Sequence, residues 1–273
     1  MVDGLIGDWI AVRKQLEGPC FASMRNVLSA LDSQHWPNLD ALNAISDSSR
    51  IRHGHHQRLR FVPPLHGGSA MSYETQTAAT GEVPTRQNMH DLFNALQWLS
   101  FPRLKSAINT EHVKRLQVGG THEAKSRSKA RDVLTMFDES GVIISSTDVS
   151  LLDLLREFQW KRLFIERRAD VMAHMHFVVV GHGLMEKALR PFIGITGKAI
   201  LLKMDVSTYC DTARLDQCAA AWIENASNLL TATSLSPIPL LGIPGWDARN
   251  EDANFYDNTD YFRRGRQCRR TVT

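Results

Sequence analysis

The sequence predicts an α+β fold, in which a mostly helical single domain over residues 1–273 carries a small antiparallel sheet. Three observations predict this class. Apolar residues recur at three- and four-residue steps in several segments, as in amphipathic helices. β-Branched and aromatic residues on both sides of Gly141 predict a β-hairpin near 132–146. The composition, 43% hydrophobic and 22% charged, is that of an average globular protein and excludes a disordered or collagen-like chain.

The first 86 residues divide into two parts of different character. Residues 1–45 form a predicted N-terminal helical part, because the apolar residues between Met24 and Leu31 follow helical spacing. Residues 47–86 are rich in Ser, His, Gly and Pro, which predicts loops with one short extended piece at 59–62. The stretch from Tyr73 to Arg86 is polar, and we expect it to be non-helical as well.

Residues 88–230 form the predicted core, which opens with two helices. Asn88 has the side chain of a helix N-cap, and Asp91 three residues later suits the first turn. Pro102 ends or kinks this helix and is favourable as the first residue of the next one. A polar, basic connection at 121–131 then leads to the hairpin.

In the hairpin, strands at 133–137 and 142–144 flank a turn made of Asp138, Glu139, Ser140 and Gly141. Ser146 or Thr147 then caps a further helix, and a long helical stretch is expected from about 160 to 190, where Pro191 stops it. A short buried strand at 199–202 and a helix at 215–229 complete the core.

Residues 236–273 are predicted to be a Pro- and Gly-rich C-terminal wrap that ends in a basic tail. Aromatic residues in such loops usually need burial, so we expect the wrap to be ordered. Arginines and lysines cluster in two places, and each cluster has the composition of a solvated surface. The clusters are Arg127, Lys129 and Arg131, and then Arg263, Arg264, Arg266, Arg269 and Arg270.

Net charge, cysteines and hydropathy limit the partners and the location. The chain has 32 basic and 29 acidic side chains, and this excess is too small to bind nucleic acid or an anionic membrane by total charge alone. Its four cysteines form no CxxC pair, and no apolar run approaches the length of a membrane span. Without a secretory signal at the N-terminus, these features favour the cytoplasm.

Several segments, taken in order along the chain, resemble the bacterial family named domain of unknown function 3025. They are Gly81–Arg86, His90–Leu96, Phe101–Pro102, Leu134–Gly141, Phe158–Lys161, Gly181–Lys187 and Leu241–Trp246. Each segment alone is weak, but the set is specific and covers most of the chain. The resemblance implies a single bacterial domain and assigns no activity to it.

The residues themselves indicate a site for a divalent metal. His182 and Glu186 lie four apart on a predicted helix, so both side chains project from one face. The glycines at 181 and 183 weaken a helix, which indicates that a backbone or a ligand approaches closely there. If the predicted helices pack together, four side chains with imidazole or carboxylate donors converge on one metal site. They are those of His90, His112, His182 and Glu186.

Two functions from different classes follow. In the first, the protein is a metal-dependent hydrolase in which His182 and Glu186 are catalytic and Arg86 or Lys187 holds an anionic small-molecule substrate. In the second, it is a non-catalytic binding or regulatory module whose Arg-rich surface engages a protein or nucleic-acid partner. Nucleophilic catalysis has no support, because the sequence lacks Gly-x-Ser-x-Gly. A phosphate loop is also excluded, since Ala199 follows Lys198 where a hydroxyl residue belongs.

A third pattern is the acidic set of Asp132, Asp138 and Glu139. Such a set on a hairpin is similar to the carboxylates of metal-dependent nucleases, but no lysine follows at the spacing that would complete one. Acidic residues are also expected at a turn for local hydrogen bonding. The turn interpretation is the one favoured from the sequence.

Overall fold

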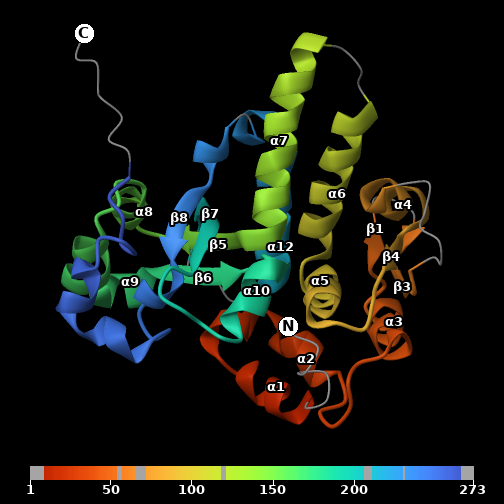
Figure 1. Cartoon of the computed structure of the whole chain (residues 1–273), viewed down its shortest axis with the longest axis horizontal. Coiled ribbons are helices and arrows are strands. Elements are labelled where there is room, and N and C mark those ends of the chain that lie inside the picture. Colours follow the sequence, from red (N-terminus) through yellow and green to blue (C-terminus); the bar gives the residue numbers. More distant parts are fainter. Residues whose placement is uncertain are drawn as a thin grey trace.

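A mixed four-stranded sheet with helices on both faces forms the centre of the molecule (Figure 1). The computed structural model describes residues 9–53, 57–64, 72–117, 121–205, 211–229 and 231–265. The strands lie in the order β6-β5-β7-β8. Their bounds are Gly141–Ser146 for β5, Met175–Val179 for β6, Thr196–Lys203 for β7 and Ser236–Pro239 for β8.

Strand β5 lies inside the sheet and determines how its two faces are used. It pairs antiparallel with β6 and parallel with β7, while β8 pairs antiparallel with β7 at the far edge. Every residue of β5 is buried, and successive side chains enter different cores. Val142 and Ile144 join one cluster and Ile143 the other, as expected where helices cover both faces of a sheet.

One face of the sheet is covered by three helices that pack against one another. They are α6 (Pro102–Gln117), α7 (Thr121–Ser140) and α12 (Thr212–Glu224). Asp216 of α12 accepts hydrogen bonds from the backbone N–H groups of Arg103 and Leu104, at 3.0 and 2.8 Å. These are the free donors of the first turn of α6, so Asp216 caps that helix from outside.

The N-terminal part packs beneath the sheet and continues to its side (Figure 1). Its helical elements are α1 (Trp9–Gln15), η2 (Pro19–Met24), α2 (Arg25–Ser29), α3 (Leu39–Ser48) and α4 (Tyr73–Thr80). Short strands β1 (Arg52–His53) and β2 (Gln57–Arg58) pair antiparallel, and β3 (Arg60–Val62) pairs parallel with β4 (Glu82–Pro84). Helix α5 (Met89–Ser100) joins this part to the centre.

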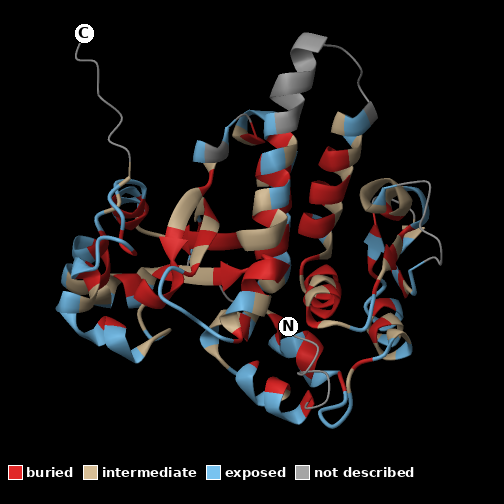
Figure 2. Ribbon diagram, viewed as in Figure 1, coloured by how far each residue is buried: buried red, intermediate tan, exposed pale blue. Residues whose placement is uncertain are grey.

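The other end of the molecule holds the segment between β5 and β6 together with the turns that follow β8. Helix α8 (Val149–Arg156), a π-helical turn η3 (Arg162–Glu166) and α9 (Arg168–His174) lie beside the short turns of the C-terminal segment. Those turns are η6 (Leu240–Gly242), η7 (Ala248–Glu251) and η8 (Ala253–Asp257). Two earlier turns, η4 (Ala226–Leu229) and η5 (Ala232–Ser234), pack against α7 instead. Figure 2 shows buried residues concentrated in the sheet and in the helices that face it.

The mostly helical α+β class is confirmed, but the predicted hairpin is wrong. Residues 133–137 belong to α7, and only the second expected strand, β5, exists. The physical reason is the spacing of four buried side chains along the segment, at i, i+3, i+4 and i+7, which places them on one helix face. They are Ala130, Val133, Leu134 and Phe137. The connection expected at 121–131 is helical as well, since α7 begins at Thr121.

Two further expectations are wrong. The expected long helix from 160 to 190 is broken by β6, because the β-branched Val178 and Val179 pair with β5 instead of continuing a helix. The polar stretch after Tyr73 is helical over eight residues, with Ser72 as N-cap and Gly81 as a left-handed C-cap. The helices that begin after Asn88 and at Pro102 are confirmed.

Among the residues that the structure describes, no helix has both the length and the apolar composition needed to cross a bilayer.

Candidate metal centre

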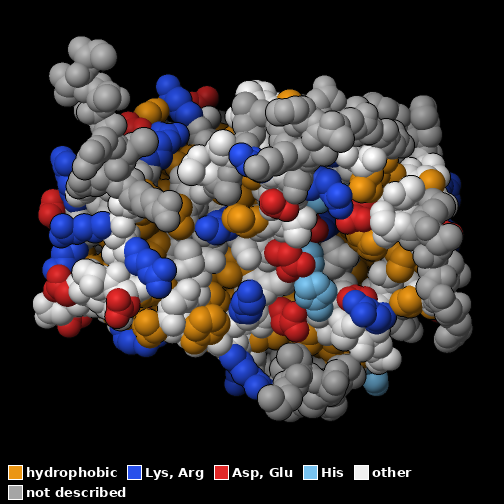
Figure 3. All heavy atoms as spheres, turned by 45° about the horizontal axis from the view of Figure 1, so that its top comes forward, with side chains coloured by type: hydrophobic (Ala, Val, Ile, Leu, Met, Phe, Trp, Pro, Cys, Tyr) orange, Lys and Arg blue, Asp and Glu red, His pale blue; other side chains and the backbone are white. Residues whose placement is uncertain are grey.

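A polar cavity of about 450 Å³ lies where α4, α5, α6, α7 and the start of α10 (His182–Ala188) come together. Three histidines line it, together with four carboxylates and two cationic side chains. In Figure 3, histidine and acidic side chains gather in the middle of one face, with hydrophobic atoms around them. A cavity of this size is suited to a small molecule.

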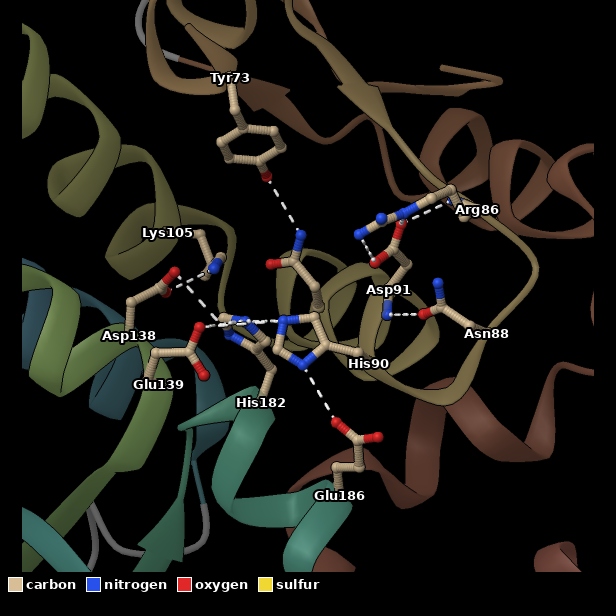
Figure 4. A network of polar contacts seen from close by, with 11 residues as sticks. Tyr73, Arg86, Asn88, His90, Asp91, Lys105, Asp138, Glu139, His182 and Glu186 are labelled. Carbon is tan, nitrogen blue, oxygen red and sulfur yellow. Dashed lines mark hydrogen bonds and ion pairs between the residues drawn. The ribbon is translucent and has the colours of Figure 1, made fainter. Parts of the chain in front are cut away.

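Two histidines and one glutamate meet at the edge of this cavity (Figure 4). Nε2 of His90 lies 3.2 Å from Nε2 of His182. Oε1 of Glu139 lies 3.4 Å from Nε2 of His182 and 3.8 Å from Nε2 of His90. Three potential ligand atoms from three helices therefore face one point.

These spacings fit a metal ion. A circle through three atoms at the printed distances has a radius of about 2.0 Å, and protein ligands bind Zn²⁺ at about 2.0–2.2 Å. Two imidazoles and one carboxylate also match the donor set of catalytic zinc sites, which keep a fourth position for water. The arrangement thus has both the dimensions and the chemistry of an open metal site.

Glu186 and Asp138 lie near the second ring nitrogen, Nδ1, of His90 and His182 respectively. Oε2 of Glu186 lies 3.1 Å from Nδ1 of His90. A carboxylate that accepts this N–H leaves Nε2 of a histidine available as a metal ligand. Oδ2 of Asp138 lies 3.8 Å from Nδ1 of His182, a buried nitrogen that makes no hydrogen bond. Asp138 is itself held by the ammonium group of Lys105 at 2.5 Å.

Glycines let the start of α10 approach the end of α7 closely. The carbonyl of Gly141 accepts hydrogen bonds from the N–H groups of Val180 and Gly181, both at 2.9 Å. A Cβ at Gly181 would lie 2.3 Å from the nitrogen of Gly141, and one at Gly183 would lie 2.2 Å from Oε2 of Glu139. The close approach expected from the two glycines around His182 is therefore present, and it seats Glu139 against α10.

The charges around the site favour the ionised form of two carboxyl groups, those of Asp138 and Glu139. The hydrogen bond with His182, aided by the charges of His182 and His90, keeps the pKa of Glu139 below its ordinary value. Burial alone would raise the pKa of Asp138, but the charges of Lys105 and His182 outweigh it and lower that pKa. Ionised carboxylates are the form that binds a metal or orients a histidine ligand.

Other polar atoms in the cavity wall lack partners. Nδ1 of His112 and Oδ1 of Asn94 are buried and make no hydrogen bond. The hydroxyl of Tyr73 accepts hydrogen bonds from Nδ2 of Asn94 at 3.1 Å and from Nε1 of Trp98 at 3.2 Å. Buried polar atoms without partners are costly, and they mark positions where a ligand supplies the missing contact.

The residues predicted from the sequence fall in different places. His90 and His182 belong to the three-atom cluster, and Glu186 lies behind His90. His112 lines the cavity but is not one of the three cluster residues. Arg86 also lines the cavity and forms a two-pronged ion pair with Asp91, at 2.9 and 3.0 Å. Lys187 is exposed and is not part of the cavity wall.

Sequence reasoning did not place Glu139 with the candidate ligands, because it assigned this residue to a hairpin turn. The helical spacing of the buried residues before it would have placed Asp138 and Glu139 at the end of a helix. His53, the described histidine of its tract, is not a member of the cluster: it is buried and its Nε2 lies 2.7 Å from Oδ1 of Asn109. Residues 54–56 lie outside the described residues.

The described residues of the two basic clusters are not part of the cavity wall. Arg263 and Arg264 line a second hollow beside β8, whereas Arg266, Arg269 and Arg270 are outside the described residues. Lys129 on α7 is exposed, and the side chain of Arg127 is outside the described part.

Comparison with known proteins identifies one family. The model of a family described as "Protein of unknown function (DUF3025)" matches residues 59–266, which include every residue of the cluster. Searches of the curated proteins and of the solved structures found no match to the chain.

Proposed function

The chain belongs to the DUF3025 family, whose description assigns no activity, and we propose from the site itself that it is a metal-dependent hydrolase. His90, Glu139 and His182 bind one divalent metal of the zinc type, and Glu186 orients His90. These three residues would leave room for water beside the metal, as catalytic zinc sites do. We also propose that the protein acts in the cytoplasm, where its free thiols at Cys20 and Cys218 stay reduced.

The observation that carries this proposal is the set of distances among the three ligand atoms, 3.2, 3.4 and 3.8 Å. The charges of the cavity support it. Among the described lining residues, four carboxylates face two cationic side chains, so a divalent cation makes the cavity neutral overall. The carboxylates are Glu74, Asp91, Asp138 and Glu139, and the cations are Arg86 and Lys105.

A bound divalent metal supplies two things to hydrolysis. It lowers the pKa of its water so that hydroxide forms near neutral pH, and it polarises the group under attack. The chain's own residues fix the ligands, exclude bulk water from the depth of the cavity and position the substrate. The anionic substrate expected from the sequence is not supported, because Asp91 neutralises Arg86 and Lys187 lies outside the cavity wall.

The test is metal content, measured by elemental analysis on protein expressed without a histidine tag. Wild type should hold close to one equivalent of metal, and His182→Ala should hold none. Glu186→Gln keeps all three ligands but replaces the carboxylate that orients His90 with a neutral amide. The affinity of this variant for the metal should fall about 10- to 100-fold. Lys187→Ala is the matched control on the same helix and should bind like wild type.

The graded pattern is what distinguishes a built site from chance binding. A folded wild-type protein that takes up no Zn²⁺, Co²⁺ or Mn²⁺ would overturn the proposed function. Equal affinities in wild type and His182→Ala would overturn the assignment of the ligands.

A second candidate function rests on the hollow beside β8. It has a volume of about 1000 Å³, and its described lining carries four cations against the single carboxylate of Asp260. Phe158 and Trp160 lie among these cations, which are Arg156, Lys198, Arg263 and Arg264. Such a surface suits an anionic partner, as in the non-catalytic binding module.

Charge reversal tests this second function. In Arg263→Glu with Arg264→Glu, binding to a single-stranded oligonucleotide should weaken and its salt dependence should become shallower. Metal content should stay unchanged, since the two arginines are not part of the cavity wall. Equal binding by the double variant and wild type would exclude the hollow as the binding surface.

A further inference from the structure

We propose that the cavity takes a carboxamide as its substrate, with Tyr73 donating a hydrogen bond to the carbonyl oxygen and Asn94 accepting one from the amide N–H. This inference rests on the proposed function and names its substrate class. It depends on the hydrogen-bonding capacity that Tyr73 and Asn94 leave unused.

The hydroxyl of Tyr73 is fixed as a donor. Its oxygen accepts two hydrogen bonds, from Nδ2 of Asn94 and from Nε1 of Trp98, so both of its lone pairs are occupied. Burial raises the pKa of Tyr73, so the hydroxyl keeps its hydrogen at neutral pH. Among the described residues, no acceptor receives that hydrogen. In Figure 4 the ring of Tyr73 projects from α4 towards the side where His90 and His182 meet.

Asn94 supplies the complementary acceptor next to this donor. Its Nδ2 is used by Tyr73, and its Oδ1 is buried without a hydrogen-bond partner. The two side chains are hydrogen-bonded to each other at 3.1 Å, so the unused donor and the unused acceptor belong to neighbouring groups. A carboxamide carries the matching pair, an accepting oxygen next to a donating N–H.

The position of Asn94 relates this pair to the metal. His90, Asn94 and Trp98 follow one another at four-residue steps on α5, so their side chains lie along one face of the helix. All three line the cavity. A group bound at Asn94 is therefore one helical turn away from the ligand His90.

The charges of the cavity favour this neutral group over an anion. Both cationic side chains in the described wall are already paired, Arg86 with Asp91 and Lys105 with Asp138. Glu74 adds a further carboxylate to the wall. An anionic substrate would have to break an ion pair, whereas a carboxamide needs only the two free hydrogen-bonding groups.

The reaction is amide hydrolysis and needs only water as co-reactant. The oxygen of water forms a bond to the carbonyl carbon, and the carbon–nitrogen bond breaks. One hydrogen of the water goes to the leaving nitrogen, which departs as an amine, and the other ionises from the new carboxylic acid. No group is oxidised or reduced. Tyr73 stabilises the carbonyl oxygen as negative charge develops on it.

The test uses two probes that bind to a metal, acetohydroxamic acid and its N-methyl derivative. Both chelate through two oxygens, but only the first has an N–H. Dissociation constants are measured on the Co²⁺-loaded full-length protein from the change in the visible absorption of the metal. Wild type should bind acetohydroxamic acid about tenfold more tightly than the N-methyl probe, which corresponds to one hydrogen bond.

Two variants assign the discrimination to the residues. Asn94→Leu should bind both probes equally, with the affinity of wild type for the N-methyl probe. Tyr73→Phe should weaken both probes about tenfold and keep the difference between them. Each variant is first checked for a wild-type Co²⁺ spectrum, which shows that the ligand cluster is intact.

Other outcomes overturn the inference. If wild type binds both probes equally, Asn94 does not present an acceptor to the ligand. If Asn94→Leu still distinguishes the two probes, the methyl group is excluded by shape and not by a missing hydrogen bond. If Tyr73→Phe binds both probes as tightly as wild type, Tyr73 donates no hydrogen bond to the ligand. A protein that gives no Co²⁺ spectrum overturns the proposed function first, and the substrate class is overturned with it.

Discussion

The C-terminal segment, residues 236–265, and the cavity both bury polar groups among aromatic rings, but they treat those groups differently. In the C-terminal segment, the fully buried Asn250 donates both Nδ2 hydrogens, to the carbonyls of Leu241 and Ile243. Its Oδ1 accepts from Arg168 at 3.1 Å. The hydroxyl of Tyr261 donates to one backbone carbonyl and accepts from one backbone N–H.

In the cavity, by contrast, polar atoms are left over. Oδ1 of Asn94 and Nδ1 of His112 are buried without partners. One polar atom each of His90, Glu139 and His182 also lies within 3.8 Å of the other two, as the ligand atoms of a metal site do. Each unpaired buried group costs stability that the fold does not recover. The difference teaches that polar groups with complete bonding hold this fold together, whereas those with incomplete bonding indicate where a ligand belongs.

The largest expected effect is on the stability of the C-terminal segment. Asn250→Ala leaves two buried carbonyls without donors and should lower the free energy of unfolding by about 3 kcal/mol. Urea denaturation measures this loss. Metal affinity should not change, because Asn250 is not part of the cavity wall. An Asn250→Ala protein as stable as wild type would remove the structural half of the comparison.

The next effect should appear in metal affinity and leave stability almost unchanged. In Gly183→Ala, the new Cβ would lie 2.2 Å from Oε2 of Glu139, so the carboxylate must move away. Loss of one ligand from its position should weaken metal binding about a hundredfold. The atom displaced is the end of a flexible side chain, so the metal-free protein should unfold within about 1 kcal/mol of wild type.

Gly245→Ala is the matched control in the C-terminal segment. Gly245 has a φ of 79° and no atom within 4 Å of an added Cβ, so alanine there is strained only through its backbone. This variant should lose about 1 kcal/mol of stability and keep its metal affinity. Competition titration with a chromophoric chelator compares the two glycine variants. Weaker metal binding in Gly245→Ala, with normal binding in Gly183→Ala, would contradict the assignment of the metal site to the cavity.

The same contrast explains how far the sequence predicts the molecule. Local signals succeed where one segment decides the outcome. Asn88 accepts a hydrogen bond from the N–H of Asp91 at 2.8 Å, and Pro102 is the first residue of its helix. The glycines at 181 and 183 also indicate a close approach, because their cost to a helix requires a compensating contact.

What the sequence does not reveal is the partner in each close approach. Glu139 lies against Gly183, 44 positions further along the chain, and His90 lies against His182, a separation of 92 positions. No local pattern gives such pairings. The β-branched and aromatic residues before Asp138 favoured a strand, yet their helical spacing decided the structure once α7 packed on the sheet.

The smallest expected effect is that of replacing His112. This substitution should keep or raise the free energy of unfolding, whereas Asn250→Ala should lower it. His112→Leu removes a buried nitrogen without a partner, so the free energy of unfolding of the metal-free protein should stay within about 1 kcal/mol of wild type or rise. Burial lowers the pKa of His112 below 6.5, so the unfolded chain binds a proton more readily than the folded one. Wild type should therefore lose stability as the pH falls below 6.5.

His112→Leu lacks this titrating group and should lose less stability over the same pH range. Urea denaturation of both proteins without metal, at pH 8.0 and at pH 5.5, measures the difference. A variant that is about 3 kcal/mol less stable at pH 8.0 would show that His112 holds the fold as Asn250 does. The distinction between completely and incompletely bonded polar groups would then fail in the cavity itself, because a residue with an unpartnered nitrogen would prove structural.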